Sequence, residues 1–233
     1  MLLIRSTIFL FFVFLISCEK RDENFFPFKE GKIWDYLINM GSSYTGKNIE
    51  KRILITNIRT KRSKSGYEIT RLHSNGNSFK YFLNNKENNV TRISAILKNN
   101  EGLIEPVKKE IYPDLSFNTK EWILTEQLFL TKGNQPPLDN FRPETNFEMK
   151  YNIEENLKKF NHRGKTYFNC YYVIGQGYTS FIADTRSGPL DVEIISEEWI
   201  CDGVGVVREK RSEITNASAF GKVSFTKELI FHK

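Results

Sequence analysis

Apolar and polar residues alternate in short segments along most of the chain, and residues 67–72 show the alternation most clearly. A period of two is the pattern of a strand with one buried face. Residues 53–58 are largely apolar on both sides, which predicts a strand covered on both faces. The predicted strands cover residues 33–38, 53–58, 67–72, 78–83, 90–97, 147–153, 166–174, 178–183, 190–199, 204–214 and 223–231. The pattern therefore predicts an all-β fold of roughly a dozen strands with few or short helices.

Turn residues separate these segments. Asn75-Gly76 is the strongest hairpin signal because both residue types tolerate positive φ. Residues 121–130 are strongly apolar, and their pattern fits either a short helix or a buried strand. The segment around Pro136-Pro137 is either a functional rim or lid of the fold or a plain surface connection.

The first residues follow a different pattern. An unbroken apolar run covers residues 8–16 behind one positive charge, Arg5. This arrangement is typical of a secretory signal. The run is too short to span a bilayer, since a transmembrane helix needs about 20 apolar residues.

Residues 15–18, Leu-Ile-Ser-Cys, resemble the lipobox of bacterial lipoproteins. The resemblance implies cleavage before Cys18 and lipidation of that cysteine, and two or more acyl chains make a membrane anchor. The alternative is an ordinary secretory signal in which Cys18 has no role. We accordingly interpret residues 1–17 as a cleaved signal peptide, 18–24 as the lipidated cysteine and its tether, and 25–233 as a single β-rich domain.

Composition adds 19 Phe, 10 Tyr and 3 Trp, which suit half-buried strands. The net charge of +6 is spread along the chain rather than gathered on one stripe, so no nucleic-acid partner is expected. The densest basic region either contacts anionic lipid headgroups or is a solvated hairpin tip. Its residues are Lys51, Arg52, Arg59, Lys61, Arg62 and Lys64.

Two cysteines remain after Cys18. Cys170 and Cys201 fall in the strand-like segments 167–174 and 197–207. An exported chain meets an oxidising environment, where disulfides persist. The two residues either form a disulfide, if their Cα atoms approach within about 7 Å, or pack separately as buried thiols.

The sequence contains no catalytic or metal-binding motif. His73, His162 and His232 lack the close spacing of zinc ligands. No serine lies in a nucleophile-elbow motif. We therefore predict no catalytic residue, no metal and no cofactor.

Two glycine pairs, at residues 175–177 and 203–205, lack the third glycine and the helix of a dinucleotide-binding loop. We interpret them as bends or close backbone approaches within strands. The carboxylates of Glu193, Glu197 and Glu198 are interpreted as solvated strand faces.

Three segments together resemble a broad set of bacterial lipoproteins that have no assigned activity. Residues 26–36 resemble the opening motif φ-P-φ-x-x-G-x-x-W-x-Y, and residues 165–173 resemble the strand G-x-Y-x-N-C-x-x-V. Residues 199–209 resemble the motif W/Y-x-A-P-G-V-G-L-V-K, although Cys201-Asp202 replaces its Ala-Pro. The resemblance implies a curved, largely antiparallel sheet, similar to the half-barrel lipoprotein carriers. It implies no activity.

These observations favour a non-enzymatic, lipid-anchored binding module that holds an apolar ligand, since ligand pockets are mostly apolar. The alternative is an envelope protein with a structural or protein-interaction role, and a hydrolase-type enzyme comes third. Glu19 differs from the aspartate that retains many lipoproteins in the inner membrane. The expected location is therefore the cell envelope, at the outer membrane.

Overall fold

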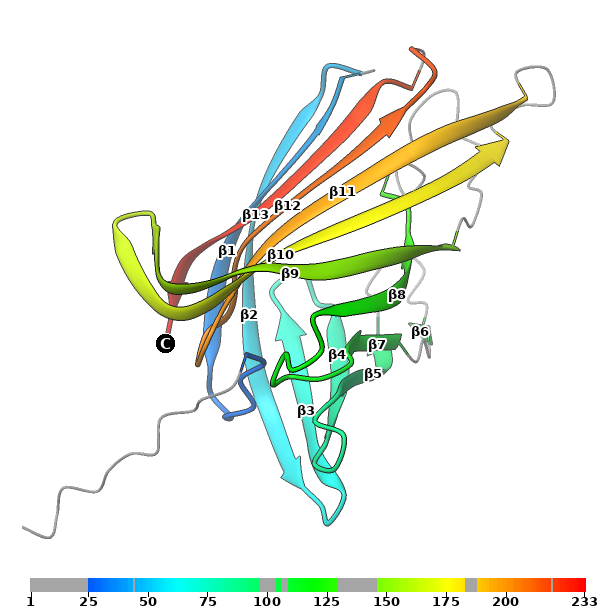
Figure 1. Cartoon of the computed structure of the whole chain (residues 1–233). Helices are drawn as coiled ribbons and strands as arrows, with labels where there is room; N and C mark the ends of the chain where they lie inside the picture. The colour runs from blue at the N-terminus through cyan, green and yellow to red at the C-terminus, as the bar shows by residue number, and fades with distance from the viewer. Residues whose placement is uncertain are drawn as a thin grey trace, which may run out of the picture.

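The computed structural model describes residues 25–43, 45–96, 104–105, 109–129, 146–182, 188–218 and 220–233. Every regular element in these residues is a strand, and all strands join one antiparallel sheet (Figure 1). The strands are β1 (Ile33–Ser42), β2 (Asn48–Arg62), β3 (Gly66–His73), β4 (Ser78–Asn84), β5 (Val90–Ile96), β6 (Ile104–Glu105), β7 (Lys109–Tyr112), β8 (Glu121–Gln127), β9 (Asn146–His162), β10 (Lys165–Ile182), β11 (Pro189–Cys201), β12 (Gly205–Thr215) and β13 (Lys222–His232). The prediction of an all-β, antiparallel fold is confirmed.

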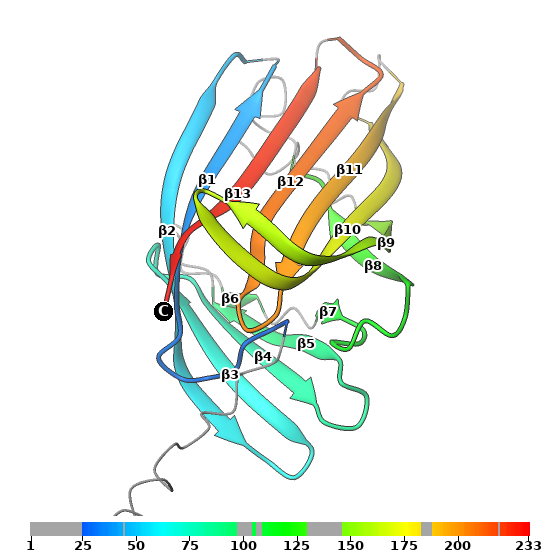
Figure 2. The same ribbon diagram turned by 60° about the vertical axis from the view of Figure 1, so that its left-hand side comes forward.

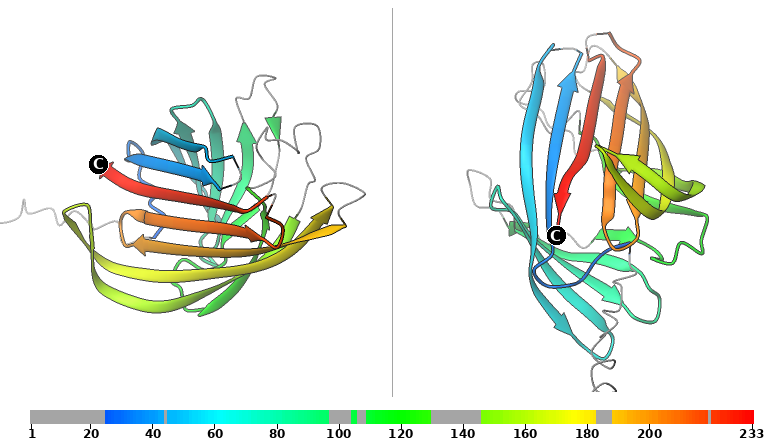
Figure 3. Two further views of the ribbon diagram at one scale, coloured as in Figure 1. Left: turned by 90° about the horizontal axis from the view of Figure 1, so that it is seen from above. Right: turned by 90° about the vertical axis from the view of Figure 1, so that its left-hand side faces the viewer.

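The strand order consists of two meanders that meet in the middle of the sheet. The order is β6-β5-β4-β3-β2-β1-β13-β12-β11-β10-β9-β8, and β7 pairs with β5. The pairing of β1 with β13 joins the first meander to the second. Seen from above, the curved sheet wraps around an interior and is nearly closed (Figure 3, left).

Strand β2 shows how the sheet bends. Its first part pairs with β1, and its last part pairs with β3. The register of β2 with β3 shifts between Asn57 and Arg59, just after the pairing of β2 with β1 ends at Thr56. A bulge of this kind bends a strand and increases its twist. The bulge therefore lets β3 and the strands beyond it turn away from β1.

Two glycines of β10 let the neighbouring strand lie across the inner face. A Cβ atom on Gly175 would lie 2.6 Å from a ring carbon of Tyr151, and one on Gly177 would lie 2.4 Å from Sδ of Met149. Both contacts are closer than real Cβ atoms tolerate. The interpretation of this glycine pair as a close approach is confirmed.

Several predicted boundaries were wrong. Residues 121–127 form a strand, which settles the helix-or-strand alternative. The predicted strands 166–174 and 178–183 are one strand, β10, and the predicted segment 197–207 is broken by a turn at residues 202–204.

The outer face of β2 was predicted to be covered, but Leu54 and Ile58 are 42% and 46% exposed. Among the residues that the structure describes, no second layer covers that side of β2. The buried apolar side chains instead gather on the concave side of the sheet and around the cysteine pair.

Candidate functional site

A row of charged side chains crosses the concave, inner face of the sheet. Lys227 on β13 stands opposite Glu209 on β12, and Glu209 stands opposite Glu198 on β11. Nζ of Lys227 donates to Oε2 of Glu209 at 3.4 Å. Opposite residues in a sheet have Cβ atoms roughly 5 Å apart, so two carboxyl groups lie side by side with one ammonium group.

Burial raises the pKa of Glu198 to about 8, and the adjacent charge of Glu209 acts in the same direction. Lys227 opposes that shift. Burial by itself would lower the pKa of Lys227, but Glu209, Tyr36 and Glu198 together raise it. Lys227 is therefore charged at neutral pH. Glu198 is mostly protonated there and can donate a hydrogen bond.

Glu198 faces a small hollow of about 100 Å³, which we call the Glu198 hollow. Most of its lining is aromatic or aliphatic, and the rings of Trp122 and Tyr151 stack with centroids 5.6 Å apart. The lining residues are Ile111, Tyr112, Trp122, Leu124, Glu126, Tyr151 and Glu198.

A second hollow, of about 180 Å³, lies beside the first, and we call it the Arg71 hollow. The two hollows share Ile111 and Tyr112 as lining residues. The Arg71 hollow is lined by Phe25, Phe26, Pro27, Trp34, Tyr36, Ile55, Arg71, His73, Tyr81, Ile111, Tyr112, Val204, Gly205, Val206 and Lys227. Its polar groups are cationic or neutral, whereas those of the Glu198 hollow are carboxyl groups and tyrosine hydroxyls.

Within the described residues, an amide, a carbonyl and aromatic rings hold the side chain of Arg71, on β3, and no carboxylate does. Its Nε donates to Oδ1 of Asn57 at 2.9 Å, and its Nη2 donates to the carbonyl of Pro27 at 3.0 Å. The guanidinium carbon lies 3.8 Å from the ring centroid of Phe26 and 4.7 Å from that of Trp34. Burial lowers the pKa of Arg71, but a guanidinium group in a protein stays protonated.

His73 responds to the cations around it. Burial, followed by the charges of Lys227 and Arg71, lowers its pKa to about 4. The imidazole is therefore neutral at neutral pH. Its ring packs against Phe79, with centroids 4.7 Å apart.

The first described residues, 25–32, cross one end of the interior and close the Arg71 hollow from that side (Figure 2). Asn57, which is fully buried, holds this segment. Its amide donates to the carbonyls of Pro27 and Lys29, and its backbone pairs with Gly31 and Lys32. The segment that follows the expected tether is thereby part of the hollow's wall.

Another arginine, Arg211 on β12, forms an ion pair inside the protein. Its Nη2 lies 2.8 Å from Oε1 of Glu213 and also donates to the carbonyl of Gln127 at 2.8 Å. Oε1 of Glu213 accepts the backbone N–H of Phe129. This network ties the end of β8 to β12 across the interior and fills that part of it.

Two wider depressions, of about 600 and 1040 Å³, are open to solvent. The first includes Lys32, Lys165 and His232, and the second lies at the ends of β8, β9 and β10. The interior is the stronger candidate for a binding site, because buried charged groups and aromatic rings line its two adjoining hollows.

The predicted cysteine pair comes together. Cys170 and Cys201 are directly opposite each other on β10 and β11, and their sulfur atoms are bonded at 2.00 Å. Cys18 and the Pro136-Pro137 segment lie outside the described residues.

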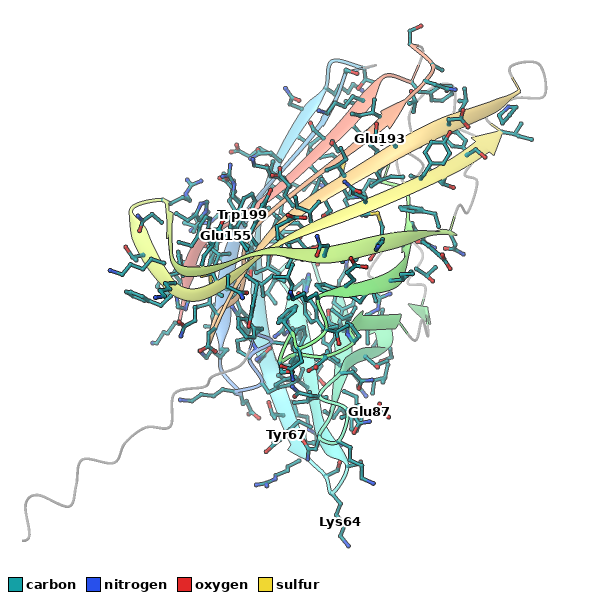
Figure 4. All side chains as sticks on the ribbon, in the orientation of Figure 1. Lys64, Tyr67, Glu87, Glu155, Glu193 and Trp199 are labelled. Carbon is teal, nitrogen blue, oxygen red and sulfur yellow. A yellow bond between two sulfur atoms is a disulfide. The ribbon has the colours of Figure 1, made fainter. Side chains whose placement is uncertain are left out.

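The predicted basic region divides into two parts. Arg59, Lys61, Arg62 and Lys64 lie at the β2–β3 hairpin, and Lys64 marks its tip (Figure 4). Lys51 and Arg52 lie farther up β2, and the guanidinium group of Arg52 pairs with Asp35. The six residues therefore do not form one surface.

The three histidines lie apart, each against a different ring: His73 on Phe79, His162 on Phe160 and His232 on Tyr167. In the described part of the chain, no three His, Cys, Asp or Glu side chains converge as metal ligands would. Nor do these residues include a helix with the length and apolarity to cross a bilayer.

Sequence reasoning missed the residues that make the interior polar. Glu193 and Glu197 face outward, and Glu193 is exposed, but Glu198 lies on the inner face, so its interpretation as a solvated residue was wrong. Alternation along the strand could have predicted this position, since Glu198 is an even number of residues from buried Val192 and Ile194 and therefore lies on the same side of β11. Arg71 shares the side of Ile69 in the same way.

No protein-family model matches the chain, and no curated protein does. A solved protein of Bacteroides fragilis, described as exported and as having a YmcC-like fold, is 12% identical and covers 91% of this chain and 99% of its own, with a TM-score of 0.42. A Parabacteroides distasonis protein described as a lipoprotein is 15% identical, with the same coverage and TM-score. A Vibrio parahaemolyticus domain described as an outer membrane lipoprotein-sorting protein is 8% identical, covers 91% of this chain and 87% of its own, and has a TM-score of 0.31. Likeness at this level assigns no function.

Proposed function

We propose that this chain is a lipid-anchored, non-enzymatic module of the cell envelope that binds a small, partly apolar ligand inside its curved sheet. The observation that carries the proposal is the lining of the interior. Aromatic and aliphatic side chains surround two adjoining hollows there, and a few charged groups point into them. Binding sites combine an apolar wall with a few placed polar groups in this manner.

The polar groups of the interior favour binding. Burying the carboxyl group of Glu198 beside Glu209 costs stability, because a buried polar group loses its hydration. Groups that weaken a fold are commonly retained where they serve a site. Here Glu198 borders the Glu198 hollow, and Arg71 and Lys227 border the Arg71 hollow.

The test uses the full-length protein isolated from its own membranes. Native mass spectrometry is expected to detect a bound small molecule in addition to the lipid on Cys18. Ile55→Phe adds a ring inside the Arg71 hollow and is expected to remove that molecule. Leu54→Phe, one residue away on the exposed outer face, is its matched control and should retain it. A wild-type protein without a bound molecule, or equal retention by Ile55→Phe, contradicts the proposal.

The anchor is a separate part of the proposal and has its own test. Lipid on Cys18 predicts that the wild-type chain fractionates with membranes and that its N-terminal peptide carries acyl mass. Cys18→Ala should lose both properties. An unmodified Cys18 in the membrane-isolated protein contradicts the anchor without affecting the ligand test.

A second candidate function, docking to another envelope protein, is favoured by the outer face. Leu54, Ile58 and Leu72 stay at least 40% exposed on the adjoining strands β2 and β3. Exposed apolar groups that adjoin one another mark interaction surfaces more often than isolated ones do. Cross-linking in cells should recover one stoichiometric partner that is lost when Leu54 and Leu72 become serine. Failure to recover one removes this candidate.

A further inference from the structure

We propose that the Arg71 hollow is an anion-binding site that takes the carboxylate or phosphate group of a small amphiphile. This inference rests on the proposed function and assigns the chemistry of its ligand. Arg71 binds the anion, and the hydroxyl groups of Tyr81 and Tyr112, which line the same hollow, donate hydrogen bonds to it.

Arg71 carries a positive charge that the described part of the protein does not balance. Among the described residues, no carboxylate lies within ion-pair distance of its guanidinium group. The groups that act electrostatically on it are Tyr81, Tyr36 and Tyr112, which are neutral at neutral pH because burial raises their pKa values. A partly buried cation without an anion is unusual, since buried charges are normally paired.

Arg71 keeps N–H donors that Asn57 and Pro27 do not use. A guanidinium group has five N–H bonds in one plane. Two of them are used, by Asn57 and the carbonyl of Pro27. The rings of Phe26 and Trp34 interact with the guanidinium through their π faces. Cation–π contacts leave the in-plane edge available, and that edge is the part of arginine that binds carboxylate and phosphate oxygens in pairs.

Tyrosine hydroxyl groups and one ammonium group also line the Arg71 hollow. The hydroxyl of Tyr36 already donates to the carbonyl of Val206 at 2.7 Å. Tyr81 and Tyr112 line the same hollow, stay protonated, and have hydroxyl groups that can donate to an anion. Lys227 adds positive charge from β13, although Glu209 partly balances it.

Volume limits what the site can hold. A hollow of about 180 Å³ is a few times the roughly 30 Å³ share of one water molecule. This is room for an anionic group and a few carbon atoms. A longer tail would continue past Ile111 and Tyr112 into the Glu198 hollow, whose wall is also largely aromatic.

Calorimetric titration of the full chain in nanodiscs, with empty nanodiscs subtracted, tests the site. The probes are octanoate, octyl phosphate, neutral octanol and inorganic phosphate. Octanoate and octyl phosphate should bind the wild type and bind Arg71→Gln between about 10-fold and 100-fold more weakly. Arg59→Gln, an exposed arginine on β2, is the matched control and should leave binding unchanged. If inorganic phosphate binds as tightly as octyl phosphate, the site recognises a free anion and the proposed amphiphile is wrong.

Other outcomes separate this inference from the proposed function. If octanol binds as tightly as octanoate and Arg71→Gln weakens neither, the interior binds ligands but the anion site is wrong. If no probe binds the wild type, both proposals fail for this ligand class. Tyr112→Phe keeps the ring and removes one donor, so it tests the same site if Arg71→Gln does not fold. It should weaken octanoate binding severalfold and leave octanol binding unchanged; equal octanoate binding would overturn the role of this wall.

Discussion

Two arginines project into the same interior and are treated in opposite ways. Arg211 meets a carboxylate and a carbonyl at 2.8 Å each and is 6% exposed. Arg71 meets an amide, a carbonyl and two aromatic faces, and it borders a hollow. The first arrangement satisfies the charge within the protein, whereas the second leaves the charge for something else to satisfy.

The difference separates structure from function inside one sheet. An ion pair such as that of Arg211 with Glu213 balances the charge within the protein and fixes one strand against another. An unsatisfied cation beside open space is a cost to stability that a binding site explains. Charge inside a fold therefore indicates a site only when its partners and the adjacent space are considered together.

Replacing Arg211 is expected to lower the free energy of unfolding more than any other change considered, and replacing Arg71 is expected to lower it less. Arg211→Met leaves the carboxylate of Glu213 buried without its cation, and we expect the free energy of unfolding to fall by about 3–5 kcal/mol. Arg71→Met leaves no buried anion behind and should cost at most about 2 kcal/mol. Urea unfolding followed by tryptophan fluorescence measures both. Equal losses would mean that Arg71 is structural too.

The disulfide is expected to contribute nearly as much. Cys170 and Cys201 are separated by 31 positions, and closing a loop of this size stabilises a fold by roughly 3–4 kcal/mol. The double serine variant should lose that amount in urea unfolding. Because neither cysteine lines a hollow, ligand binding by the folded fraction should not change. A loss of binding in that fraction would extend the site toward the disulfide.

Gly175→Ala tests the wall of the Glu198 hollow. The added Cβ meets the ring of Tyr151, so we expect a loss of about 1–3 kcal/mol from overpacking. Gln176→Ala, the exposed neighbour on the same strand, should change stability by less than about 0.5 kcal/mol. Thermal unfolding of the two variants makes the comparison. A neutral Gly175→Ala would show that Tyr151 moves freely.

The pH dependence of stability near neutral pH comes from Glu198. Its folded-state pKa, about 8, lies above the ordinary value of 4.5. Between these values the folded state binds more protons than the unfolded state, so stability falls as pH rises. His73, with a pKa lowered from 6.5 to about 4, acts oppositely, because its stability contribution is lost as pH falls through that range. Above about pH 6.5 the slope therefore belongs to Glu198.

Glu198→Gln mimics the protonated carboxyl group and should flatten that slope. The variant is expected to match the wild type near pH 5 and to exceed it in stability at pH 9. Glu193→Gln, on the outer face of the same strand (Figure 4), should keep the wild-type slope. An unchanged slope in Glu198→Gln would show that Glu198 ionises freely at neutral pH.

The sequence predicted the strands well because alternation and turn residues are local signals. The hairpin at Asn75-Gly76 and the close approach at Gly175 both follow from short patterns that contain glycine. The length of β2 was missed, because its pairing with two different strands across a bulge decides it.

The candidate site was harder to predict. Parity places Glu198 and Arg71 on the buried side of their strands, but their meeting around two hollows depends on strand order and curvature. The pairing of β1 with β13 brings Lys227 near Arg71, which lies far from it in sequence. No local pattern carries that information.

The most direct measurement of the central claim is to locate a bound amphiphile. A photoreactive fatty acid can be cross-linked to the full chain, and the labelled peptides identified by mass spectrometry. The account predicts labels on the inner wall, at Trp34, Tyr81 or Tyr112, that are lost in Arg71→Gln. Labels confined to exposed outer residues such as Phe168 and Tyr178, or labels that persist unchanged in Arg71→Gln, would contradict it.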